Sequence, residues 1–201
     1  MTTLFLDIET TGIPFCTFGR FPDYANLSKY ENARAVQISW IVMKDNKILQ
    51  DTNCIIKPNG FDISNSHIHG ISQARALKEG MDIKTALKYF AEDCEEAIMN
   101  DGKLICHNVD FDLNIIKSEF HRANMPVDDI DQLHTFCTMK SACKPNQRWP
   151  KLVALYSEYF KETYPAHSAL EDAYACLRCY HWLTQKIDMK DEIEQARKEL
   201  E

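Results

Sequence analysis

Residues 4–12 read Leu4-Phe5-Leu6-Asp7-Ile8-Glu9-Thr10-Thr11-Gly12. An apolar run that ends in two threonines and a glycine predicts a β-strand and its exit. Successive side chains of a strand point to opposite faces, so Asp7 and Glu9 lie on the same face. Two carboxylates therefore stand side by side where an apolar strand ends. Taken alone, such a pair is more often a solvated strand rim in which one carboxylate caps a turn.

A second acidic segment, Cys106-His107-Asn108-Val109-Asp110-Phe111-Asp112, joins a short apolar strand to a helix. Asn108 or Asp110 would serve there as a helix N-cap, which is the structural interpretation of this segment. Asp112 is less needed for capping. Helical periodicity lets its side chain face the strand end while Phe111 turns to the core.

A third acidic segment, His167-Ser168-Ala169-Leu170-Glu171-Asp172, begins an amphipathic helix. Ser168 and Glu171 fit a capping box, which gives Glu171 a structural task. His167 then precedes the cap and Asp172 is the fourth helical position, and side chains at these two positions meet at helix starts. In isolation His167 is a surface histidine and Asp172 a charge favoured by the helix dipole. The joint occurrence of three such segments favours a functional cluster.

Bringing the carboxylates of Asp7, Glu9, Asp112 and Asp172 into one cleft is unfavourable without cations. At an effective dielectric constant near 20, each pair about 4 Å apart costs on the order of 4 kcal/mol. The cluster therefore implies bound metal ions. All-oxygen ligands favour Mg²⁺ or Mn²⁺ over zinc, and magnesium held by carboxylates and substrate phosphate is typical of phosphoryl transfer.

The three segments resemble, in order and spacing, the motifs of the DnaQ-like, or DEDDh, family of 3′-to-5′ exonucleases. His69-Gly70-Ile71-Ser72 is similar to a family segment that lies beside the bound strand. The resemblance covers Leu4 to Trp182 and implies a ribonuclease-H-like fold. It also implies that nucleoside 5′-monophosphates are released from the 3′ end of DNA, single-stranded or frayed, and that a DNA polymerase subunit is a candidate partner.

The resemblance further implies a two-metal mechanism with Mg²⁺ or Mn²⁺. Asp7 would bridge the two ions, Glu9 and Asp172 would help to hold the ion that activates water, and Asp112 would position the second ion. His167 would act as the general base, a role suited to imidazole because it titrates near neutral pH.

Two other functions use the same residues. A 3′-5′ exoribonuclease would have the same site, because selection between the sugars depends on a few contacts around the 2′-OH. A non-catalytic module that binds strand ends is less favoured, since a pure binder gains nothing from clustered carboxylates that repel one another.

Contacts to the strand are expected from residues around the motifs and from a basic segment. Thr138–Lys151 contains no acidic residue but four basic ones, Lys140, Lys144, Arg148 and Lys151. A solvated loop accounts for them equally well. The expected substrate-binding residues are Thr10, Thr11, Gly12, His69, Asn108, Phe111 and Arg148. Phe15 or Tyr24, in the long loop between Ile13 and Asn32, are candidates for stacking on a terminal base.

The remaining pattern predicts an α/β fold with a mixed five-stranded sheet flanked by helices. The expected strands are Leu4–Ile8, Ala35–Met43, Ile48–Ile56, Leu104–Cys106 and, more weakly, Ile130–Cys137. The expected helices are Asp82–Met99, Asp110–Ala123, one opened by Trp149-Pro150, and Ala166–Ile187. Residues 1–187 would form the exonuclease domain and residues 188–201 a charged helical tail.

Composition sets the broad class. A chain of 201 residues with 45% hydrophobic and 26% charged residues is typical of one globular domain. No apolar run predicts a membrane span or a secretory signal, and eight dispersed cysteines indicate reduced thiols, so we expect a cytoplasmic protein. Cys176 and Cys179 have a metal-like spacing but no second pair, which favours helix packing. The net charge of −7 disfavours a protein that holds duplex DNA by its backbone.

Overall fold

A mixed sheet of five strands forms the centre of the computed structural model, which describes residues 1–200. The strand order is β3-β2-β1-β4-β5, in which β2 is antiparallel to both β1 and β3, and β4 is parallel to both β1 and β5. The mixed five-stranded sheet expected from the sequence is therefore confirmed. The strands are β1 (Thr2–Thr10), β2 (Ala35–Lys44), β3 (Lys47–Ile55), β4 (Lys103–Cys106) and β5 (His134–Cys137).

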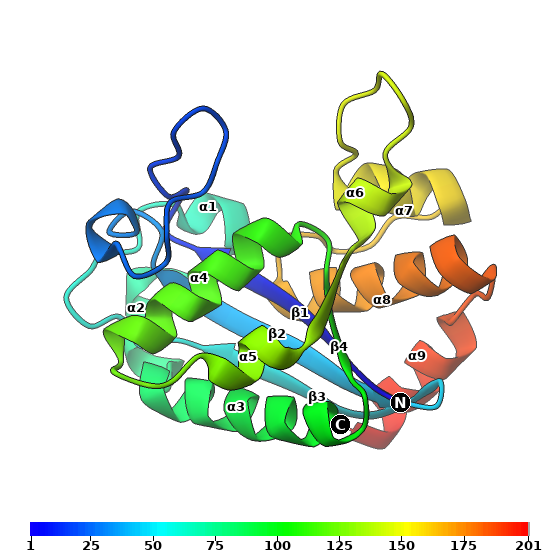
Figure 1. Ribbon diagram of the computed structural model, residues 1–201, viewed down its shortest axis with the longest axis horizontal. Coiled ribbons are helices and arrows are strands. Elements are labelled where there is room, and N and C mark those ends of the chain that lie inside the picture. Colours follow the sequence, from blue (N-terminus) through cyan, green and yellow to red (C-terminus); the bar gives the residue numbers. More distant parts are fainter. Residues whose placement is uncertain (201) are drawn as a thin grey trace.

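Helices cover both faces of this sheet (Figure 1). One face packs against α3 (Ile83–Met99), α4 (Val109–Arg122) and α5 (Asp128–Gln132). The other face packs against α7 (Leu152–Phe160), α8 (Ala169–Gln185) and α9 (Lys190–Leu200). The shorter helices are η1 (Leu27–Lys29), α1 (Ser66–His69), α2 (Gln73–Glu79) and α6 (Thr138–Ala142).

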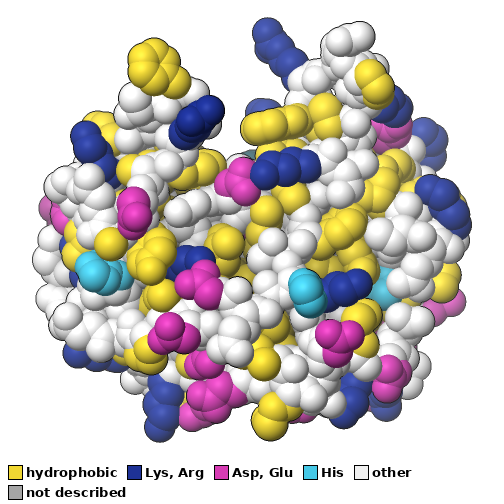
Figure 2. All heavy atoms as spheres, viewed as in Figure 1, with side chains coloured by type: hydrophobic (Ala, Val, Ile, Leu, Met, Phe, Trp, Pro, Cys, Tyr) yellow, Lys and Arg dark blue, Asp and Glu magenta, His cyan; other side chains and the backbone are white. Residues whose placement is uncertain are grey.

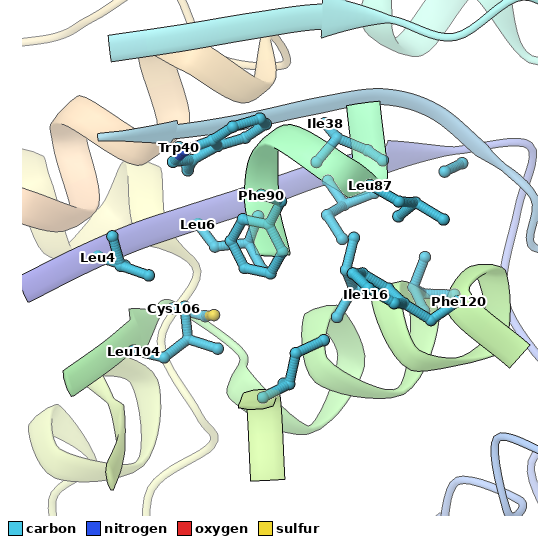
Figure 3. Packing of buried hydrophobic residues seen from close by; sticks show 14 of the residues in the cluster. Leu4, Leu6, Ile38, Trp40, Leu87, Phe90, Leu104, Cys106, Ile116 and Phe120 are labelled. Carbon is cyan, nitrogen blue, oxygen red and sulfur yellow. The ribbon is translucent and has the colours of Figure 1, made fainter. Parts of the chain in front are cut away.

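The alternation of side chains along β1 divides the core into two layers. Leu4 and Leu6 are fully buried and point toward α3 and α4, and Figure 3 shows Leu6 beside Phe90. Phe5 points to the opposite face and packs with α8. Because strand side chains alternate, Asp7 is on the same face as Phe5, at the level where α8 begins.

Several expected elements differ from those observed. Residues 130–132 belong to helix α5, and β5 begins only at His134. The basic segment contains α6, which was not expected. Helix α7 begins at Leu152 with Lys151 as its N-cap, so Trp149-Pro150 lies outside it. Within residues 1–200, no helix is long and apolar enough to cross a membrane.

Candidate active site

The end of β1 presents its two carboxylates to the α8 side of the sheet. The pairing of β1 with β2 shifts register between Glu9 and Thr10, so the ladder is irregular directly after Glu9. Such irregularities bend a strand and re-aim its side chains, and they are common beside active sites. Asp7 and Glu9 are both partly exposed, although their neighbours on β1 are buried.

Asp112 reaches the same place from the first turn of α4. Its side chain is only 3% exposed, an unusual environment for a carboxylate without a cationic partner. Burial raises the pKa of Asp112 well above its usual value. Backbone N–H groups of Asp112 and Ile8 oppose this shift, and the charges of Glu9 and Asp172 add to it. As expected, Asp112 faces the strand end, while the adjacent Asp110 pairs with Lys140 at 2.6 Å.

The start of α8 is fixed by distant residues, and the expected capping box is wrong. The Ser168 side chain makes no capping hydrogen bond. The Ala169 N–H instead donates to Oε1 of Gln37, from β2, at 3.1 Å. Glu171 accepts two hydrogen bonds from the guanidinium of Arg197, at 2.8 and 2.7 Å. The start of α8 is therefore held by hydrogen bonds to residues of β2 and α9 and not by the local capping box that the sequence predicts.

Both carboxylate oxygens of Asp172 accept hydrogen bonds from the protein. Its Oδ1 accepts a hydrogen bond of 2.6 Å from the Tyr164 hydroxyl, and its Oδ2 accepts one of 3.1 Å from the backbone N–H of His167. His167 has a left-handed backbone with φ of +68°, a conformation that needs support from its surroundings. Ligand atoms of Glu9, His167 and Asp172 all lie within 4.8 Å of one another.

The electrostatics of this cluster favour a bound cation. Burial raises the pKa of Asp7 well above its usual value, and the charges of Asp112, Asp172 and Glu9 raise it further. Burial and the Asp172 charge raise the pKa of Glu9 to about 7. The pKa of Asp172 is also raised, mainly by burial. Carboxylates that oppose each other's ionisation in this way become compatible when hard cations lie among them.

A cavity of about 640 Å³ opens over the cluster. It lies near the base of the notch that Figure 2 shows between two projecting parts of the surface. The cavity brings together all five expected catalytic residues, together with Asn108 and Phe111 from the expected substrate contacts. Its lining includes Asp7, Glu9, Asp112, His167, Asp172, Asn108, Phe111, His107, Met139, Trp149, Lys151, Val153 and Tyr164.

The expected contacts at the strand exit line no part of this cavity. Thr10 and Thr11 use their hydroxyls to fold the exit, by hydrogen bonds with Gly12 O (2.6 Å) and Arg34 N (3.0 Å). At Gly12, a Cβ atom would lie 2.7 Å from the carbonyl oxygen of Asn32, so this position needs glycine for close backbone approach.

His69 is also placed away from the cavity. Its ring is 6% exposed and lies between Asn65 Oδ1 and the backbone N–H of Ile71, each at 3.2 Å. Asn65 in turn donates to the Thr10 carbonyl at 2.8 Å, which ties α1 to the end of β1. A ring held in this way supports the strand exit.

The four basic residues of Thr138–Lys151 have different surroundings. Lys140 pairs with Asp110, and Lys144 pairs with Glu158 at 2.8 Å. Arg148 is exposed and lines a small separate hollow, whereas Lys151 lines the main cavity. The cation that reaches the cavity is therefore Lys151.

Tyr164 and Trp149 line the cavity but were not among the contacts expected from the sequence, whereas Lys151 belongs to the basic segment from which contacts were expected. Trp149 is 61% exposed, and an exposed aromatic side chain inside a basic segment is a combination typical of nucleic-acid contact. That signal was available in the sequence. Tyr164 had no such signal, because its contact with Asp172 depends on how the connection between α7 and α8 folds.

Family comparisons agree with this geometry. The family model described as exonuclease, RNase_T, matches residues 4–180. A comparison with curated protein sequences gave no match. An exonuclease I from Methylocaldum szegediense is 15% identical with a TM-score of 0.68, and the alignment covers 92% of this chain and 41% of that one. The chain thus spans less than half of that relative.

Two further structures share the fold. E. coli exonuclease I in complex with a dA16 oligonucleotide is 19% identical over 96% of this chain and 42% of that one, with a TM-score of 0.64. The nuclease domain of 3′hExo, a DEDDh family member bound to rAMP, is 13% identical over 92% of both chains, with a TM-score of 0.62. The matched motifs, the sheet order and the acidic cavity lead to one conclusion: this chain belongs to the RNase_T exonuclease family, as a DnaQ-like member with a ribonuclease-H-like fold.

Proposed function

We propose that this chain is a metal-dependent 3′-5′ exonuclease that hydrolyses terminal phosphodiester bonds of DNA and releases nucleoside 5′-monophosphates. The observation that carries the proposal is the convergence of four carboxylates and one histidine, from three distant segments, on a single open cavity. This convergence argues against a non-catalytic binding module. Buried carboxylates without cations destabilise the fold, and a protein that only binds strand ends gains nothing from them.

Asp7, Glu9, Asp112 and Asp172 would hold two Mg²⁺ or Mn²⁺ ions. Their donor set is all oxygen. Burial raises the pKa of each carboxyl group, and charges within the cluster raise the pKa of Asp7, Glu9 and Asp112 further. When bound, the ions would stabilise charge on the attacking and leaving oxygens of an in-line displacement.

His167 would take the proton from the attacking water. Its side chain is exposed at the cavity, next to Glu9 and Asp172, and its backbone is fixed by the hydrogen bond to Asp172. A fixed backbone limits the positions that the imidazole can reach, which lowers the entropic cost of proton transfer. The Tyr164 hydroxyl orients Asp172 from the other side.

The apolar part of the cavity would hold the terminal nucleotide. Phe111 and Trp149 give it aromatic surfaces on which a base can stack, Val153 adds an apolar contact, and Lys151 gives it a cation for a backbone phosphate. Such contacts distinguish neither one base from another nor ribose from deoxyribose, so RNA is an alternative substrate for the same site. The fold does not separate the two substrates, since solved structures that share it hold a DNA oligonucleotide in one case and rAMP in another.

The proposal extends to a partner and a compartment. A chain of net charge −7 attracts nucleic acid poorly at long range, so a proofreading DNA polymerase that delivers the 3′ end would assist it. Co-purification with a polymerase would test this partnership. Eight free cysteines, most of them buried, fit a reducing compartment such as the cytoplasm.

The test uses 5′-labelled 20-mers of DNA and RNA, single-stranded and duplex, incubated with Mg²⁺, Mn²⁺ or EDTA. We expect a ladder of products shortened from the 3′ end with either metal and none with EDTA. Asp7→Asn is expected to lower kcat by about 100- to 1,000-fold, because it removes one charge from the cluster that holds the ions.

Asp45→Asn is the matched control, since Asp45 is exposed in the turn between β2 and β3, beyond the opposite end of β1. It is expected to leave the product ladder unchanged. Hydrolysis that continues in EDTA, or in Asp7→Asn at the wild-type rate, would exclude the proposed mechanism. Preference for RNA over DNA would replace the proposed substrate and keep the chemistry.

A further inference from the structure

Two projecting segments flank the active-site cavity, and neither contains an acidic residue. We name residues 13–22 the first lobe and residues 143–151 the second lobe. Figure 1 shows them rising on either side of the sheet end, and Figure 2 shows the notch between them. The first lobe carries Arg20 and no carboxylate, and the second carries Lys144, Arg148 and Lys151 and no carboxylate. In a chain of net charge −7, this distribution favours a polyanion between the lobes.

The first lobe ends in a tight hairpin with an unusual residue at its tip. Thr17 and Arg20 exchange two backbone hydrogen bonds, of 3.1 and 3.0 Å, around Phe18 and Gly19. Both central residues have positive φ, +50° for Phe18 and +72° for Gly19. A two-residue turn of this kind favours asparagine or glycine at its first central position, and a phenylalanine there is strained.

Phe18 is also 100% exposed. Both the backbone conformation and the exposed ring disfavour phenylalanine at this position, and no contact within residues 1–200 compensates either. A residue whose backbone conformation and exposure are both unfavourable, with no compensating contact in the fold, is typical of a functional position. The natural compensation is a contact with a ligand that has a flat apolar surface.

The surroundings of Phe18 combine an aromatic surface with a cation. A hollow of about 570 Å³ lies along the first lobe and is lined by Thr17, Phe18, Arg20, Phe21 and Pro22. Arg20 is exposed, and within residues 1–200 it forms no ion pair. An aromatic ring beside an unpaired guanidinium suits a nucleotide, since the base stacks and the phosphate pairs.

This hollow is connected to the active-site cavity through two aromatic rings. Phe21 lines the hollow, and its ring meets that of Phe111 edge-on with centroids 6.1 Å apart. Phe111 in turn lines the active-site cavity. The hollow and the cavity therefore adjoin at these two rings, which places the first lobe beside a strand whose terminal nucleotide occupies the cavity.

We propose that the first lobe is a second nucleic-acid subsite, in which Phe18 stacks on an unpaired base and Arg20 binds a phosphate, upstream of the terminal nucleotide. Tyr24, by contrast, packs against His121 and under Lys117, so its ring is not free for this task. The subsite rests on the proposed function, because it assigns the position of the strand relative to the active-site cavity. It binds DNA or RNA alike, through base and phosphate.

The test compares a long substrate with one too small to reach the lobe. Single-stranded 20-mers of DNA and RNA are the long substrates, and the p-nitrophenyl ester of thymidine 5′-monophosphate is the small one. In Phe18→Ala/Arg20→Gln, the ratio of kcat/KM for the 20-mers to kcat/KM for the ester is expected to fall about tenfold, the effect of losing one stacked base. The loss should come from KM. Met99→Ala/Lys88→Gln, on the exposed side of α3, is the matched control and should keep the wild-type ratio.

An unchanged ratio in Phe18→Ala/Arg20→Gln would overturn the subsite and leave the exonuclease proposal intact. An equal loss on the ester and the 20-mers would also overturn it, since the lobe would then act on the active-site cavity. A wild-type protein that cleaves neither substrate would refute the exonuclease proposal. In that case fluorescence anisotropy of a labelled 20-mer decides the subsite alone: weaker binding by the double variant supports it, and equal binding overturns it.

Discussion

At the scale of single residues, the contact between Tyr164 and Asp172 makes a specific prediction. Hydrogen bonds to carboxylates that hold metal orient them, and their removal typically costs about 10- to 100-fold in metal affinity or activity. Tyr164→Phe removes only the hydroxyl that donates to Asp172 Oδ1. We expect the Mg²⁺ concentration for half-maximal activity to rise about tenfold, measured by titrating Mg²⁺ at saturating substrate.

The control for this prediction is Tyr159→Phe, which removes the hydroxyl of a half-buried tyrosine on α7, outside the cavity lining. Its Mg²⁺ requirement should match that of the wild type. If Tyr164→Phe instead lowered kcat at every Mg²⁺ concentration by the same factor, Tyr164 would act on the reaction and not on the geometry of Asp172.

Residues of the cluster were predictable where a short-range periodicity determines direction. Strand alternation places Asp7 and Glu9 on one face, and the helical period turns Asp112 toward the strand end. Tyr164 was not predictable, because it reaches Asp172 through an irregular connection whose path no period describes. For His69, a recognisable sequence segment was a poor guide to the contacts of the side chain. The residue lies in a recognisable segment, but its contacts with Asn65 and Ile71 became visible only in the fold.

At the scale of elements, α9 holds the first turn of α8 and thereby the backbone that carries Asp172. The Arg197 guanidinium binds Glu171 with two hydrogen bonds and lies 4.2 Å from the Tyr174 ring centroid. Arg197→Ala is expected to lower the free energy of unfolding by about 1–2 kcal/mol. A bidentate, partly buried ion pair stabilises the fold more than an exposed ion pair does. Urea denaturation followed by circular dichroism measures this change.

Arg75→Ala is the comparison, because Arg75 and Glu79 form an exposed pair within α2, with both side chains about half exposed. Its effect should stay below about 0.5 kcal/mol. Equal effects of the two substitutions would mean that α9 does not stabilise the start of α8.

Elements were predictable where one strong hydrophobic period covers them. Helix α3 and strands β1, β2, β3 and β4 follow the expected ranges within about two residues. Helix α6 was missed because its five residues are too few to show a period. The capping box was wrong because a tertiary partner, Arg197, takes the glutamate that a local rule assigns to the helix end.

At the scale of the whole molecule, the active-site carboxylates make stability depend on pH in a characteristic direction. A carboxyl group whose pKa is higher in the folded than in the unfolded state binds more protons when folded. The stability it contributes is therefore lost as pH rises from the unfolded value toward the folded value. For Glu9 that window runs from about 4.5 to about 7. Bound cations reverse the effect, since they favour the ionised form.

Glu9→Gln isolates this contribution from the other titrating groups of the protein. In EDTA at pH 5, the Tm of Glu9→Gln should lie near that of the wild type. At pH 7.5 the variant should be more stable by about 3–6 °C, corresponding to about 1–2 kcal/mol after allowance for the partial exposure of Glu9. With excess Mg²⁺ at pH 7.5 the order should reverse, because the wild type alone keeps its full set of ligands. A Tm difference in EDTA that stays constant from pH 5 to 7.5 would show that the cluster does not oppose the ionisation of Glu9, and an order unchanged by Mg²⁺ would remove Glu9 from the set of metal ligands.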